Sequence, residues 1–153
     1  MQGEVGQAAP FGSLEEEAYL NLLRTTDALV RTEVEMLREY GLSPTQYSAL
    51  RILRRAGKGG VTCREMSDRM LTRDPDVTRL VDRLESRKLI RRVRLETDRR
   101  VVRTRITDAG LDLLQRIDEP SRRWMKEHLG HLRAEQLRAL ISLLELARGR
   151  FDA

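Results

Sequence analysis

The sequence predicts a mainly helical protein that carries one small β-hairpin, and three observations support this fold class. Apolar residues recur at intervals of three and four through most of the 153 residues, which is the period of helices with one buried face. Around residues 92–106 polar and apolar residues alternate instead, which is the period of strands. Residues 73–106 hold twelve Arg or Lys and six Asp or Glu, a balance of +6 in a chain of net charge +5. Such a concentration of positive charge is typical of proteins that bind polyanions.

The N-terminal part predicts a loose arm followed by a long helix. Residues 1–12 show no periodicity and are expected to form a flexible arm. Ser13 and Glu16 match a capping box, so a helix is expected from there to about Tyr40, with Gly41 as its stop signal. Its apolar stripe is longer than a small core can cover, so we predict a dimerisation helix over residues 13–41, with packing inside the same chain as the alternative. The stripe recurs at heptad spacing and consists of Leu22, Leu23, Leu29, Val30, Met36 and Leu37.

Two further capping boxes predict two short helices. Ser43 and Gln46 form one box, with Pro44 at the first helical position, and that helix ends in the glycine-rich segment 57–60. Thr62 and Glu65 form the other box, which begins a helix that runs to about residue 70.

The next helix has one apolar face and one basic face. Asp74 suits its N-cap and Pro75 its first position. Two short helices joined by a brief turn, the second basic on its outer face, form a helix-turn-helix, whose second helix fits the DNA major groove. An ordinary solvated helix is the alternative for this segment alone. The apolar stripe is Val77, Leu80, Val81 and Leu84, and the outer face is Thr78, Arg79, Asp82, Arg83 and Ser86.

A β-hairpin is expected after this helix. Residues 92–95 and 102–106 alternate as half-buried strands, and residues 96–100 form a charged turn between them. An arginine on a protruding hairpin can enter a narrow minor groove, and Asp98 is expected to hold the Arg100 side chain by a charge-assisted hydrogen bond. A helix for one groove beside a hairpin for the next is a winged helix-turn-helix. A solvated turn is the alternative.

Two helices are expected after the hairpin. Thr107 and Asp108 cap the first, and Pro120 is expected to break or kink it. The last begins at Arg133 and stops at Gly149, and we expect a second subunit to cover its apolar face, which consists of Leu137, Leu140, Ile141, Leu144 and Ala147. The predicted organisation is therefore a flexible arm (1–12), a dimerisation helix (13–41), a winged helix-turn-helix module (42–110) and C-terminal dimerisation helices (111–153).

Other classes of function receive little support. The chain has no Gly-rich phosphate loop, nucleophile elbow, HExxH or Cys/His cluster, so we predict neither an enzyme nor a cofactor or metal site. Cys63 is expected to be an inert thiol rather than a redox sensor, and His128 and His131 a solvated pair rather than metal ligands. A single cysteine and no apolar run near the ~20 residues of a membrane span predict a cytoplasmic protein.

From Leu42 onward, over about two-thirds of the chain, the sequence resembles the MarR family of bacterial transcription regulators. Residues 41–50 (GLSPTQYSAL) resemble the second helix of the family, and residues 77–85 (VTRLVDRLE) resemble its recognition helix. Lys88 departs from the family, which usually has a glycine there to supply a left-handed turn. The wing pattern D-x-R-x-x-x-V-x-L-T falls on Asp98, Arg100, Thr104, Ile106 and Thr107, with Gly110 following, and Thr104 and Ile106 replace the usual Val and Leu.

The resemblance implies a homodimer that binds a pseudo-palindromic operator on double-stranded DNA and usually represses a nearby gene. It implies major-groove contacts by Arg73, Thr78, Arg79 and Arg83. Wing contacts by Asp98, Arg99 and Arg100 in the minor groove, and phosphate contacts by Thr62 and Arg64, are expected as well.

The resemblance also implies an effector, because many members of the family release DNA when a small aromatic or phenolic ligand binds between the dimer helices and the DNA module. The candidates to line that space are Met36, Tyr40, Tyr47 and Trp124, although large apolar residues at helical spacing more often form core. The alternative function is a winged-helix protein-interaction module that docks an acidic partner. Selection of a palindromic DNA sequence would separate the two functions.

Overall fold

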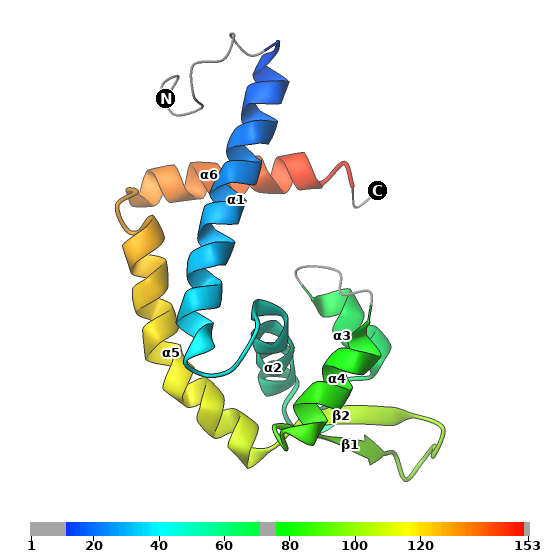
Figure 1. Ribbon diagram of the computed structural model, residues 1–153. Coiled ribbons are helices and arrows are strands. Elements are labelled where there is room, and N and C mark those ends of the chain that lie inside the picture. The colour runs from blue at the N-terminus through cyan, green and yellow to red at the C-terminus, as the bar shows by residue number, and fades with distance from the viewer. Residues whose placement is uncertain (1–11, 71–75, 152–153) are drawn as a thin grey trace.

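The computed structural model describes residues 12–70 and 76–151, and it contains six α-helices and one two-stranded antiparallel sheet in the described residues (Figure 1). The predicted fold class is confirmed. The elements are α1 (Leu14–Arg38), α2 (Pro44–Ala56), a 3-10 turn η1 (Gly57–Gly59), α3 (Cys63–Arg69), α4 (Val77–Ser86), β1 (Ile90–Arg94), β2 (Val102–Ile106), α5 (Asp108–Leu129) and α6 (Ala134–Arg148).

The predicted capping boxes determine where the first helices begin. In α2 and α3 both reciprocal bonds form, between Ser43 and Gln46 and between Thr62 and Glu65. At α1 the Ser13 hydroxyl accepts from the backbone N of Glu16 at 3.2 Å, but the Glu16 carboxylate bonds to the backbone N of Gly12 instead of closing the box. Four N–H groups at each helix start lack a helical partner, and these side chains satisfy part of them.

The start of α4 differs from the prediction. Its N-cap is Asp76, whose carboxylate accepts from the backbone N of Arg79 at 2.9 Å, so the helix begins at Val77. Asp74 and Pro75, the predicted cap and first residue, lie outside the described residues. Two aspartates one residue apart are equally good capping types, and only the backbone path decides which carboxylate reaches the N–H three residues ahead.

The hairpin pairs residue 90 with 106 and residue 94 with 102, so β1 begins two residues earlier than predicted. A further bridge joins it to the linker before α3, because Val61 and Thr104 exchange backbone hydrogen bonds of 3.0 and 2.7 Å. Gly60 makes this close approach possible: its φ is +63°, and a Cβ on it would lie 2.4 Å from the Thr104 carbonyl oxygen. The hairpin is thereby attached to the helical body at its base.

The core lies where α2, α4 and the first half of α5 meet. Side chains from all three helices are fully buried there, including Leu50, Leu53, Val81, Leu84, Leu114 and Ile117. The α5 helix continues through Pro120 to Leu129, so the proline does not break it, and Figure 1 shows the helix axis bending along its length. The predicted boundary between residues 110 and 111 falls inside α5, which therefore belongs both to the module and to the C-terminal part.

The α1 and α6 helices are largely exposed, and α1 and the second half of α5 project away from the module toward α6 (Figure 1). In α1 only Leu37 is buried among the described side chains, and in α6 none is. None of the described helices is both long enough and apolar enough to span a bilayer.

Lys88 is the one non-glycine residue with positive φ in the described part of the chain, at +60°. It supplies the left-handed turn between α4 and β1 that a glycine would adopt without steric cost. We expect Lys88→Gly to raise the free energy of unfolding by about 0.5–1 kcal/mol, since the relieved backbone strain of ~1–2 kcal/mol exceeds the added entropy of the unfolded chain.

Urea denaturation at equal protein concentration measures this effect. Lys88→Ala is the matched control, because it removes the same side chain but keeps the Cβ. A Lys88→Gly protein no more stable than Lys88→Ala would contradict the expectation.

Candidate nucleic-acid interface

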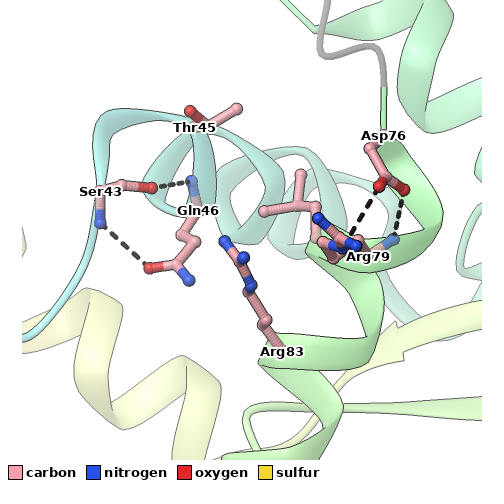
Figure 2. Close-up of a pocket in the computed structure, with 7 residues that line it drawn as sticks. Ser43, Thr45, Gln46, Asp76, Arg79 and Arg83 are labelled. Carbon is pink, nitrogen blue, oxygen red and sulfur yellow. Dashed lines mark hydrogen bonds and ion pairs between the residues drawn. The ribbon is translucent and has the colours of Figure 1, made fainter.

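The outer face of α4 presents two arginines of the predicted recognition set. Thr78, Arg79 and Arg83 are exposed, opposite the buried stripe of the helix. Arg79 lies with its Nε 3.4 Å from the carboxylate of Asp76, and 70% of its side chain is exposed. Asp76 therefore both caps the helix and braces Arg79 (Figure 2). Arg73, the fourth predicted residue, lies outside the described residues.

A hollow of about 220 Å³ lies between this face and the start of α2. Figure 2 shows Arg83 extending from α4 toward the capping box of Ser43 and Gln46, and Thr45 lines the same hollow. The sequence reasoning assigned none of these α2 residues to the interface. The signal was present, because the box at the start of α2 has the same pattern as the Thr62 box, for which a phosphate contact was predicted.

The predicted phosphate contacts at the start of α3 are partly engaged already. The Thr62 hydroxyl accepts from the backbone N of Glu65 at 3.1 Å, and the backbone N of Thr62 donates to the Glu65 carboxylate at 2.8 Å. This backbone hydrogen bond, together with the charge of Arg103, holds the pKa of Glu65 below its usual range, so the carboxylate stays ionised. Arg64 is exposed beside it, and its phosphate contact stays a prediction.

The tip of the hairpin exposes Asp98, Arg99 and Arg100 together. Asp98 Oδ1 accepts from the backbone N of Arg100 at 3.0 Å, and the described residues give no ion pair between the two side chains. The predicted brace is therefore wrong in its partner. An aspartate reaches the main-chain N–H two residues ahead more easily than a long side chain that points into solvent. Asp98 shapes the turn and leaves the Arg100 guanidinium at the outer end of the hairpin (Figure 1).

Not all of the positive charge in residues 73–106 faces outward. Arg87 donates from Nη1 to the carbonyl of Gly41 at 2.6 Å and so connects the end of α4 to the end of α1. Arg103 donates from Nε to the carbonyl of Gly59 at 2.9 Å and pairs with Glu65 at 3.1 Å, which ties β2 to the start of α3. Arg92 pairs with Asp82 and Glu85 of α4. The charge count predicted a cationic segment, but these three arginines hold the elements of the module together.

The residues predicted to line an effector space lie in two places. Tyr47 is buried in the core, and Met36 and Tyr40 pack against it. Trp124 lies further along α5, where its indole N–H donates to the Thr32 hydroxyl of α1 at 3.1 Å. Their role as a ligand pocket stays a prediction. A separate hollow of about 250 Å³ is lined by Ser48, Arg51, Ile52 and Arg55 of α2 and by Arg69 of α3.

Comparison with known proteins adds an independent line of information. A model of the MarR family matches residues 40–101. The chain is 30% identical over 122 residues to the uncharacterized HTH-type transcriptional regulator YpoP of Bacillus subtilis (strain 168), an alignment that covers 80% of this chain and 85% of YpoP. It is 29% identical over 109 residues to the HTH-type transcriptional regulator MhqR of the same organism, covering 71% of this chain and 74% of MhqR.

Solved structures share both sequence and fold with this chain. A MarR transcription factor from Planctomyces limnophilus is 44% identical, with a TM-score of 0.68 over 90% of this chain and 99% of that one. Sco3205, a MarR family regulator from Streptomyces coelicolor solved in complex with DNA, has a TM-score of 0.81 at 19% identity over 94% of this chain and 92% of its own. The organohalide-sensing regulator RdhR-CbdbA1625, solved with 2,4-dichlorophenol bound, has a TM-score of 0.81 at 22% identity over 96% of this chain and 89% of its own. The last two show likeness of fold alone.

Proposed function

This chain belongs to the MarR family of winged helix-turn-helix transcriptional regulators, and on that premise we propose that it acts as a homodimeric repressor which a small-molecule ligand releases from a pseudo-palindromic operator. It is a DNA-binding regulator and not an enzyme, as the sequence predicted. The observation that carries the proposal is the joint exposure of Arg79 and Arg83 on α4 and of Arg99 and Arg100 on the adjoining hairpin.

In this proposal the two elements have different tasks. Thr78, Arg79 and Arg83 read base edges in the major groove, where arginine pairs with guanine. Arg99 and Arg100 enter the flanking minor groove, where the negative potential of a narrow groove favours arginine. Contacts from Arg64 and from the starts of α2 and α3 position the backbone without reading sequence.

The dimer is supported by the apolar surface that one chain leaves exposed. Most of it lies on α1 and α6, and it includes Tyr19, Leu22, Leu23, Val30, Val34, Leu140, Ile141, Leu143 and Leu146. Monomeric proteins rarely expose a contiguous apolar surface of this kind, and a second copy of the same helices would cover it. Two modules related by a two-fold axis would place their recognition helices about one turn of B-form DNA apart.

In-vitro selection of bound DNA from a random pool tests the proposal. We expect enrichment of a pseudo-palindrome with half-sites centred about 10 base pairs apart. Recovery of unrelated sequences with salt-sensitive binding would instead favour a basic surface that docks an acidic protein partner.

Arg79→Ala is expected to weaken binding to the selected site by about 1–3 kcal/mol and to relax the preference for the base it contacts. The loss is base-specific because the brace by Asp76 presents the guanidinium at a defined place on α4. Titrations against the selected site and against single-base variants measure both effects. Arg138→Ala on α6 removes the same charge from an exposed position outside the proposed interface and serves as the control. Equal losses on every base variant would contradict the assignment.

The effector part of the proposal is supported by the arginine-lined hollow between α2 and α3. Arg51, Arg55 and Arg69 form its cationic wall and Ile52 supplies an apolar surface, a combination that suits an aromatic anion such as a phenolate or an aromatic carboxylate. The ligand of the similarly folded RdhR-CbdbA1625 is a chlorinated phenol. We expect 2,4-dichlorophenol or benzoate to raise the melting temperature and to release the selected DNA. Arg51→Gln should abolish both responses.

A further inference from the structure

Arg92 makes more side-chain contacts to recognition helix α4 than any other described residue of the hairpin, although the strand it belongs to is part of the wing. Its Nη2 donates to Asp82 Oδ1 at 2.5 Å and its Nη1 donates to Glu85 Oε2. The other oxygen of Glu85 accepts from the backbone N of Arg92 at 3.0 Å. One guanidinium therefore bridges two carboxylates one helical turn apart, and Glu85 also holds the main chain of β1.

The place of this bridge matters for how α4 and the hairpin are held. Asp82 lies on the outer face of α4, between Arg79 and Arg83 in the sequence, so Arg92 reaches into the surface proposed to face DNA. The backbone connection it spans is the left-handed turn at Lys88, where the chain lacks the glycine that would adopt φ +60° without strain. The side-chain bridge holds α4 and β1 in register at a turn that the backbone itself does not favour.

The bridge also changes the charge at the surface. Asp82 and Glu85 are half-exposed carboxylates beside cations proposed to meet phosphates, and unpaired they would repel the DNA. Pairing with Asp82 and Glu85 raises the pKa of Arg92, so the guanidinium remains charged and bound to them.

We propose that Arg92 is a positioning residue for DNA binding: without touching DNA, its bridge to Asp82 and Glu85 fixes the angle between α4 and the hairpin, so that Arg79 and Arg100 engage their grooves together. This inference rests on the proposed function. It adds that the specificity of the interface depends on a residue that contacts only protein, because contacts made on two separate elements count jointly only when their relative placement is held.

The test is a set of titrations of purified dimer against the selected operator. Arg92→Lys keeps the charge but cannot bridge both carboxylates in a fork, and we expect it to weaken binding about 10-fold to 100-fold, as Arg92→Gln does. The double variant Asp82→Asn/Glu85→Gln removes two negative charges, so electrostatics alone would make it bind more tightly. Positioning makes it bind more weakly, by about tenfold.

Two further readouts exclude a merely structural role. The slope of affinity against salt should stay that of the wild type in Arg92→Lys, because no phosphate contact is lost. Arg100→Ala should weaken binding far less in the Arg92→Lys background than in the wild type, because a displaced wing has already lost that contact. Thermal melting of each variant establishes that the dimer is folded at the assay temperature.

The outcomes separate the two claims. If the wild type selects a palindrome and Arg100→Ala weakens binding, yet Arg92→Lys binds like the wild type, the positioning role is overturned while the proposed function stands. A tighter-binding Asp82→Asn/Glu85→Gln variant, or strictly additive losses for Arg92→Lys and Arg100→Ala, overturns it as well. If the wild type selects no DNA, the proposed function fails first.

Discussion

Replacing Leu143 and Leu146 with glutamate is expected to convert the protein into a folded monomer that has lost operator binding. In a single chain these side chains are 64% and 77% exposed, so charges there cost little in the monomer. In a dimer built on α1 and α6 the same charges would be buried without partners, at a cost of several kcal/mol. Separating the two modules removes the linkage between half-sites, and affinity should fall at least about a hundredfold.

Sedimentation equilibrium and operator titration measure the two consequences together. Ser142→Glu is the matched control, because it adds a charge to the same helix at an exposed polar position between these leucines in the sequence. We expect it to remain dimeric and to bind DNA. A double glutamate variant that stays dimeric would show that this part of α6 does not form the interface.

Arg100→Ala is expected to weaken operator binding by about 1–3 kcal/mol, roughly tenfold to a hundredfold, while the fold is unchanged. The Arg100 side chain is exposed at the tip of the hairpin and makes none of the side-chain hydrogen bonds or ion pairs seen among the described residues, so its loss disturbs no packing. Its energy of interaction with a narrow minor groove is lost almost entirely, since alanine reaches no groove atom.

The location of the loss within the DNA site identifies its cause. Arg100→Ala should flatten the preference at the positions flanking each half-site and leave the central half-site bases unaffected, whereas Arg79→Ala should do the reverse. Arg138→Ala again controls for net charge. An Arg100→Ala protein that retains wild-type affinity and wild-type flanking preference would remove the wing from the interface.

Local signals in the sequence were enough to predict most element boundaries. The capping boxes at Ser43 and Thr62, the N-cap at Thr107 and the stop at Gly149 all lie within a residue or two of their predicted positions. A cap bonds to an N–H only two or three residues ahead, so the sequence pattern contains the whole interaction. The left-handed turn at Lys88 was expected as well, although lysine is a poor residue for it.

The same local reasoning failed where a side chain had a choice of partners. Asp98 bonds to a neighbouring main-chain N–H instead of the Arg100 side chain, and Asp76 rather than Asp74 caps α4. In α6 the predicted apolar face left out Leu143 and Leu146, the most exposed leucines of that helix. A helical period identifies a face, but it does not tell which apolar residues another subunit has to cover.

The sequence alone determined the kind of protein: a helical, cationic, winged helix-turn-helix regulator, because periodicity, caps and charge depend on residue types at short separations. Only the tertiary structure decided which arginines are available to a ligand. Arg92 and Arg103 have the same composition and exposure preference as Arg79 and Arg100, yet they are bound to carboxylates that the fold brings to them across 7 and 38 residues. Whether a guanidinium faces solvent or another element depends on how the helices pack, and that is a property of the whole chain.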